Sequence, residues 1–419
     1  MKIEKGTIFK TLGNFAVLVL LLAAGVNLYA KLFYFLLAAI FVAAITHKLR
    51  LDGVTVVYVL LAVLMAVYNV ESGIKAMVRP VTYAGLYVVG LSLTRVTAPK
   101  SDPYMLPVEK GEKSANNLLA VVALGTFVHF MLNFVYNFGA DIGRNTLDFW
   151  TGEKASATLQ ASLACLMLGF SVAGVFFAKK GLNKIICAIC LVCIMAYNLV
   201  LAGRTIIVIF AVIALICFVV WLFTYKNARA KARAIGVVLG VVAGGLALVL
   251  FNVGGIKDAI EASNLYDRFV NVSIEEILDT GRMGFKLKYI QLALEYPFGG
   301  GKIYEIVGRY AHDIFLDAYS EYGIFAFLMI VIVIIWGTKE LVKMLKSKNV
   351  GLFTKMAFLC VSIVLMLEFA VEPILAGMQW LFSIYCLVNG CIKGINLNVA
   401  KQKKLNTPQK ALYLKRNTD

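Results

Sequence analysis

Residues 204–224, R-T-I-I-V-I-F-A-V-I-A-L-I-C-F-V-V-W-L-F-T, contain no charged side chain after Arg204. A helix of about 20 such apolar residues spans the hydrocarbon core of a bilayer. Similar runs recur along the 419 residues of the chain, and hydrophobic residues make up 61% of it. A soluble domain is far less apolar. The sequence therefore predicts an all-α polytopic membrane protein.

The apolar runs along the chain predict about twelve transmembrane helices. Their ranges are 12–30, 32–46, 53–70, 77–95, 116–138, 158–178, 184–202, 204–224, 234–253, 323–342, 352–371 and 375–392. The first run follows a short basic segment, but it is long enough to remain in the membrane, so no cleavable signal peptide is expected. The stretch after about residue 394 is rich in lysine and poor in apolar residues, which predicts a flexible tail.

A long hydrophilic interval separates the ninth and tenth predicted spans. Residues 254–322 hold 11 of the 24 acidic residues and 7 of the 41 basic ones. A loop of this length usually has a function of its own. The predicted organisation is therefore spans one to nine in 1–253, a catalytic loop in 254–322, spans ten to twelve in 323–393 and a basic tail in 394–419.

The distribution of positive charge predicts the orientation in the membrane. With both termini in the cytoplasm, 28 of the 41 Lys and Arg residues fall on the inner side and 13 on the outer side. Cytoplasmic loops carry such an excess. The long loop is then expected on the outer face. The basic pI of 9.4 has this topological explanation, so we expect no nucleic-acid partner.

The long loop contains signals for three short helices. The capping-box spacing at 273–276 predicts one helix start. A second helix is expected from about 280 to 295, since apolar residues recur at 283, 287, 290 and 294. Pro297 and the three glycines after it end that helix. A third is expected to begin near Ala311 and to continue into the tenth span.

Two arginines on the outer side are candidates for phosphate binding. Arg204 begins the eighth span after a very tight turn, and Arg282 is expected in the first turn of a loop helix. A guanidinium forms bidentate contacts with phosphate, and a helix start adds backbone N–H groups. The alternatives are that Arg204 reaches towards lipid headgroups and that Arg282 is solvated.

His312 is the candidate general base, since it precedes a predicted helix at the outer membrane face. Asp313, Asp317 and Glu321 follow at intervals of four, so they either orient a sugar or keep one helical face hydrated. Glu368 lies in the eleventh span, where a carboxylate is costly unless it is functional or paired, for example with Arg79 or Arg204.

A further outer segment, 139–157, contains Arg144 and the pair Phe149–Trp150. These aromatic residues either anchor the chain at the membrane interface or stack on sugars. The sequence has no GxxxxGK[ST], GxSxG or HExxH motif, and we expect neither a metal nor a cofactor.

The order of these motifs resembles the O-antigen ligase and Wzy-type polysaccharide polymerase superfamily. The matching residues are Gly203, Arg204, Thr205, Arg282, Phe285, Ala293, Pro297, Gly299, Gly301, His312, Phe315, Leu316, Glu321 and Gly323. The resemblance is specific over the loop and otherwise rests on span number and topology. It implies a GT-C-like fold and a bacterial inner-membrane glycosyltransferase that works without metal and inverts the anomeric configuration.

The resemblance also implies roles for individual residues. The donor would be a glycan on undecaprenyl diphosphate, His312 would act on the attacking hydroxyl, and Arg204 and Arg282 would bind the diphosphate. Independently of the resemblance, Asp313, Asp317, Glu321, Glu368 and Arg144 are candidates for supporting this site. Asp313 departs from the family pattern, in which asparagine is commoner, and this leaves the role of His312 beside it open.

The sequence leaves the acceptor open. A polymerase joins one lipid-linked repeat to another, with a chain-length regulator as a conceivable partner, whereas a ligase transfers the glycan to lipid A–core or another acceptor. We favour the polymerase. A flippase or secondary transporter is an alternative of another class. Transporters built from two sets of six spans have their largest connection inside, between spans six and seven. Here the largest connection is expected outside, after span nine.

Overall fold

The computed structural model describes residues 5–96, 106–139, 145–225, 249–261 and 282–416, with a few further residues between 227 and 266. In this part of the chain, nine helices are long and apolar enough to cross a membrane. They are formed by α1 (Lys5–Val26), α4 with α5 (Ile74–Val78 and Val81–Thr94), α6 (Pro107–Tyr136), α7 (Ala157–Phe177), α8 (Gly181–Val200), α9 (Arg204–Thr224), α16 (Ile314–Lys346), α17 (Leu352–Val371) and α19 (Gln379–Arg416). The prediction of an all-α polytopic membrane protein is confirmed.

Two of the predicted spans are shorter helices. They are α2 (Leu32–Thr46) and α3 (Gly53–Tyr68), which are apolar but fall below 18 residues. The predicted ninth span, 234–253, lies largely outside the described residues. The total of twelve spans therefore stays a prediction.

The centre of the bundle is formed by α19, which packs along α5 and also contacts α6, α16 and α17. Glycines make this close packing possible. A Cβ at Gly90 of α5 would lie 2.4 Å from the carbonyl oxygen of Leu387, and one at Gly390 would lie 2.1 Å from that of Tyr87. Small residues allow transmembrane helices to approach in this way.

The last helix extends much further than the sequence predicts. Residues 394–416, expected to form a flexible tail, continue α19 as helix to Arg416. The polar residues at the start of this continuation donate hydrogen bonds to neighbouring helices. Asn398 donates to the Thr94 carbonyl at 2.8 Å, and Asn396 donates to the buried Glu340 carboxylate at 2.6 Å.

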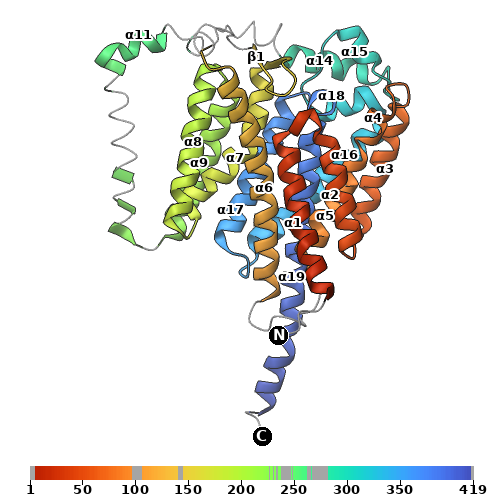
Figure 1. Cartoon of the computed structure of the whole chain (residues 1–419), viewed down its shortest axis with the longest axis vertical. Helices are drawn as coiled ribbons and strands as arrows, with labels where there is room; N and C mark the ends of the chain where they lie inside the picture. The colour runs from red at the N-terminus through yellow and green to blue at the C-terminus, as the bar shows by residue number, and fades with distance from the viewer. Residues whose placement is uncertain are drawn as a thin grey trace.

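The two ends of the bundle differ. Figure 1 shows the start of α1 and the end of α19 at one end, and α14 (Arg282–Ala293) and α15 (Lys302–Val307) at the opposite end. The loop helices and the chain termini are thus on opposite sides of the bundle, as the predicted topology requires. Which side faces the cytoplasm stays a prediction.

A small hairpin caps the end of the bundle near the loop helices. Strands β1 (Asn145–Leu147) and β2 (Lys154–Ser156) pair antiparallel. The sequence analysis did not predict it, since three-residue strands are too short to show periodicity. The Trp150 indole N–H in its turn donates to the Val26 carbonyl of α1 at 2.8 Å. Trp150 therefore ties the hairpin to the end of α1.

The loop helices have a small core of their own. Tyr289 of α14, Ile303 of α15 and Ala311 are buried together. The second predicted loop helix is confirmed as α14, whereas α15 was not predicted. The signal at 273–276 lies outside the described residues. The third predicted helix begins at Ile314 rather than near Ala311. The difference has a local cause, because His312 has a φ of +54°, which a continuous helix cannot contain.

The loop joins the bundle at a kink in α16. Gly323, with φ +78° and ψ −176°, breaks the helix between its first nine residues and its membrane portion. The Ile324 N–H donates to the Pro297 carbonyl at 2.9 Å, and the Gly300 N–H donates to the Glu321 carbonyl at 3.0 Å. The P-F-G-G-G segment at 297–301 is therefore the joint between the loop and the last three spans.

Candidate functional site

The start of α16 positions His312. Asp313 is its N-cap, and the Asp313 Oδ1 accepts hydrogen bonds from the backbone N–H groups of Phe315 at 3.0 Å and Leu316 at 3.3 Å. His312, immediately before it, is half-buried and has left-handed backbone dihedrals. Such a conformation is uncommon for a residue other than glycine, and strained residues of this kind cluster at functional sites. The cap thus holds His312 in a defined position at the helix start.

Lys286 of α14 connects this turn to the end of α17. Its ammonium lies 3.1 Å from the Asp313 Oδ2 and donates to the Ala370 carbonyl at 2.7 Å. Both side chains of the ion pair are about one-fifth exposed, with relative exposures of 21% and 19%. A partly buried pair of this kind is screened less by salt than a surface pair. Lys286 therefore holds α14, α16 and α17 together beside His312.

Glu368 lies one turn before the end of α17 and is fully buried. Its Oε2 accepts a hydrogen bond from the Ser162 hydroxyl of α7 at 2.8 Å. One partner of this buried carboxylate is therefore a serine of α7, and the expected pairing of Glu368 with Arg79 or Arg204 stays a prediction. Glu368 and the Ala370 carbonyl that contacts Lys286 are two residues apart on the same helix end.

Arg204 is the first residue of α9, which packs against both α7 and α17. The tight turn expected before it is present. Ala202 has a φ of +49°, and the Asn198 side chain donates to the Gly203 carbonyl at 2.8 Å. A Cβ at Gly203 would lie 2.2 Å from the Asn198 Oδ1, so a larger residue there would displace the Asn198 side chain. The Arg204 side chain is half-buried at this turn.

The acidic residues after Asp313 have different environments. Asp317 is buried, and its Oδ1 accepts a hydrogen bond from the Ala311 N–H at 3.1 Å. It therefore braces the His312 turn from inside and does not hydrate the helix surface. Glu321 is half-buried at the joint with the glycine segment.

Two predicted site residues cannot be placed by their side chains. Arg282 is the first residue of α14, but its side chain lies outside the described part of the structure, and Arg144 lies outside it altogether.

The structure brings Asp313, and with it His312, beside the end of α17. Lys286 was not singled out from the sequence. The available signal was its position four residues after Arg282, the spacing that aligns two positions on one helix face.

We expect Lys286→Met to lower the transferase activity that the sequence predicts, while Lys288→Met leaves it unchanged. Lys286 makes two contacts that fix the His312 turn, whereas Lys288, on the same helix, is exposed. Leaving a partly buried carboxylate without its cation costs about 1–3 kcal/mol. The measurement is the rate of transfer by both variants, together with their thermal unfolding midpoints. Equal rates for the two variants would contradict the positioning role of Lys286.

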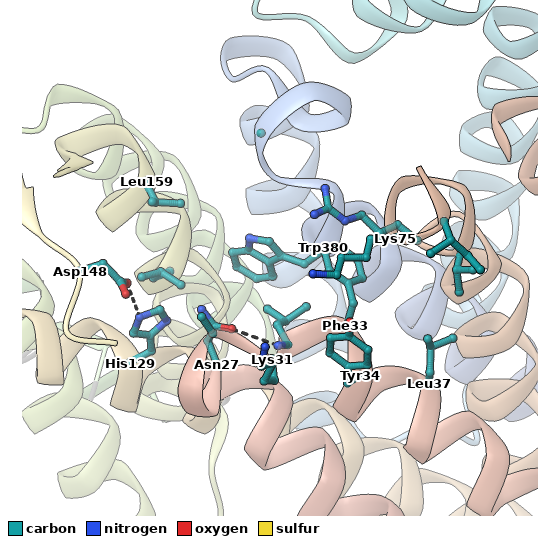
Figure 2. A pocket seen from close by; sticks show the side chains of 17 residues that line it. Asn27, Lys31, Phe33, Tyr34, Leu37, Lys75, His129, Asp148, Leu159 and Trp380 are labelled. Carbon is teal, nitrogen blue, oxygen red and sulfur yellow. Dashed lines mark hydrogen bonds and ion pairs between the residues drawn. The ribbon is translucent and has the colours of Figure 1, made fainter. Parts of the chain in front are cut away.

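A cavity of about 610 Å³ is lined by the turn between α1 and α2, by α4 and by the connection between α17 and α19. Figure 1 shows the α1–α2 turn and α4 at the same end of the bundle as the loop helices. Figure 2 shows its wall, with Lys31, Lys75 and Trp380 on one side and the His129–Asp148 pair on the other. The sequence did not predict this cavity, because its lining comes from helices and turns that are far apart in the chain.

His129 and Asp148 form a buried pair on the cavity wall. The His129 Nε2 of α6 lies 2.7 Å from the Asp148 Oδ2. The Asp148 Oδ1 accepts from the backbone N–H groups of Trp150 and Thr151. Burial alone would raise the pKa of Asp148. The hydrogen bond and charge of His129, with the two backbone donors, outweigh it and lower the pKa below its ordinary value.

No protein-family model and no curated protein matches this sequence.

Proposed function

We propose that the protein is a metal-independent, inverting glycosyltransferase of the outer face of a bacterial inner membrane. Its donor is a glycan linked to undecaprenyl diphosphate, and it polymerises repeat units of a surface polysaccharide. Both termini are cytoplasmic in this proposal, and the fold is GT-C-like. The observation that carries it is the site at the start of α16, where Lys286 holds His312 and Asp313 against the end of α17.

The proposed reaction uses His312 at the attacking oxygen. The acceptor hydroxyl attacks the anomeric carbon, the bond from that carbon to the lipid diphosphate breaks, and His312 accepts the hydroxyl proton. Negative charge develops on the departing diphosphate. Arg204 and Arg282 would stabilise it there, which is where electrostatic stabilisation has the largest effect on rate.

The environment of Asp313 supports the resemblance on which the proposal draws. Its carboxylate caps α16, and one oxygen accepts two backbone hydrogen bonds. Asparagine and aspartate cap helices about equally well. An aspartate at a position where the family more often has asparagine therefore preserves the geometry around His312. The additional negative charge is balanced by Lys286 at 3.1 Å.

The test is whether released lipid diphosphate and joined glycan appear in equal amounts. The purified protein in lipid nanodiscs would receive only its lipid-diphosphate-linked repeat unit. A ladder of longer glycans with matching release of lipid diphosphate is the expected result. Release and joining only after addition of lipid A–core would identify a ligase instead. Movement of the donor across a vesicle membrane with no diphosphate release would identify a transporter and contradict the proposal.

A further inference from the structure

The cavity of about 610 Å³ has a marked positive charge. Lys31 follows the turn after α1, and Lys75 and Arg79 belong to α4 and the residue after it. All three line the cavity. In the part of the chain that the structure describes, none of them forms an ion pair with a carboxylate. Their charges are therefore available to an anion that enters the cavity.

The one carboxylate on the cavity wall does not cancel this charge. Asp148 is engaged by His129 and by backbone N–H groups of its own turn. Its side chain is only 12% exposed. The His129 ring beside it is 3% exposed, and its Nδ1 has no hydrogen-bond partner within the described residues. The wall opposite the cations thus carries a buried imidazole with one nitrogen that has no partner among the described residues.

The remaining wall is apolar and aromatic. Trp380, at the start of α19, lies between Lys75 and the His129–Asp148 pair (Figure 2), and Leu159 and Leu163 of α7 continue the surface. An indole combines a flat apolar face with a polar N–H edge. A ligand with both an apolar face and several hydroxyl groups matches this wall. The volume lies in the range of about 300–1,000 Å³ that is usual for small-molecule sites.

We propose that this cavity binds a sugar that carries a carboxylate or phosphate group. The anion would lie between Lys75 and Arg79, and the ring would pack on Trp380 and point hydroxyl groups towards His129. A guanidinium and an ammonium form charge-assisted hydrogen bonds with either anion. The cavity therefore binds an acidic sugar more tightly than a neutral one.

The position of the cavity connects it to the proposed transferase site, and in this respect the inference rests on the proposed function. Gly377 lines the cavity, and Ala370, seven residues earlier, contacts Lys286 beside His312. Seven residues span at most about 25 Å even when fully extended. An oligosaccharide of a few sugars can cover that distance. The cavity would then select an acidic sugar within the acceptor or the growing glycan.

An anionic phospholipid headgroup is the competing occupant. Lysine and arginine near a membrane surface commonly contact headgroups. A headgroup would use the cations but would have no need of an indole wall or of the buried His129–Asp148 pair. The observations therefore favour the sugar, and the experiment separates the two.

The experiment measures binding of glucuronic acid, glucose 6-phosphate and glucose by ligand-observed NMR. The protein would be in phosphatidylcholine nanodiscs with no donor present. We expect both acidic sugars to bind at least about tenfold more tightly than glucose, the effect of one or two hydrogen bonds to a charged group. Lys75→Gln combined with Arg79→Gln should remove this preference and leave glucose binding unchanged.

Three controls make the outcome decisive. Lys288→Gln with Lys302→Gln removes the same number of charges from exposed positions on the loop helices and should preserve the preference. Lys75→Arg combined with Arg79→Lys keeps the charge and should also preserve it. His312→Ala should bind acidic sugars as the wild type does, so loss of transfer and loss of this site are distinguishable.

Equal binding of glucuronic acid and glucose to the wild type would overturn the proposal, as would a preference that survives loss of both cations. If the double substitution instead weakened only the retention of phosphatidylglycerol in mixed nanodiscs, the cavity would be a headgroup site and the proposal would be wrong.

Discussion

Replacing His312 by alanine is expected to lower the rate of glycan transfer by about 10²–10⁴-fold, the usual contribution of a general base. Expression and donor binding should change little. The reason is geometric, because Asp313 and Asp317 fix the turn on either side of His312 through backbone N–H groups that alanine retains. Only the imidazole is lost. The measurement is the initial rate of lipid diphosphate release from the repeat-unit donor.

His47→Ala is the matched control. His47 is the C-cap of α2, and its ring contacts the Thr46 hydroxyl at 2.8 Å. Since α2 begins beside the cavity, its C-terminal end points away from the end of the bundle that carries the loop helices. The variant removes the same side chain and should transfer at the normal rate. Asp313→Asn, which keeps the helix cap, should retain most of the activity. A normal rate of transfer by His312→Ala would show that His312 takes no part in the reaction.

The membrane class was predictable because it depends on a local property. Each long apolar run must satisfy its backbone hydrogen bonds within itself in a bilayer, so it forms a helix whatever its neighbours are. The described spans at 157–177, 204–224 and 352–371 accordingly match the apolar runs to within a few residues. The helical continuation to Arg416 was not predictable from hydropathy, because Asn396 and Asn398 are stabilised by partners on α16 and α5.

For the candidate site, the sequence singles out residues but does not give their arrangement, and their roles stay predictions. The positions of His312, Arg204 and the glycines followed from motif order. That Asp313 caps a helix and pairs with Lys286 depends on where α14 lies against α16, and this contact joins residues 27 positions apart. No local stretch of sequence predicts the cavity, since its lining residues extend from Asn27 to Trp380.

Gly299→Ala is expected to destabilise the protein much more than Gly300→Ala, although the two glycines are neighbours with nearly the same backbone conformation. Their φ angles are +77° and +79°. Holding an alanine in the left-handed region at either position therefore costs about 1–2 kcal/mol. They differ in the space around the new methyl group. A Cβ at residue 299 would lie 2.3 Å from the Gly323 nitrogen and 2.8 Å from the Tyr322 carbonyl carbon, whereas nothing lies within 4 Å of one at residue 300.

The clash at residue 299 cannot be relieved by a side-chain rotation, because the atoms it meets are backbone. The joint between the glycine segment and the α16 kink must open, at a further cost of about 1–3 kcal/mol. The bond from the Ile324 N–H to the Pro297 carbonyl, at 2.9 Å, would be lost with it. Thermal unfolding in one detergent, with both variants and the wild type in parallel, measures the difference. Because this joint also fixes the start of α16, Gly299→Ala should reduce transfer where Gly300→Ala does not. Equal midpoints for the two variants would mean that the close approach of residues 299 and 323 does not hold the loop to the bundle.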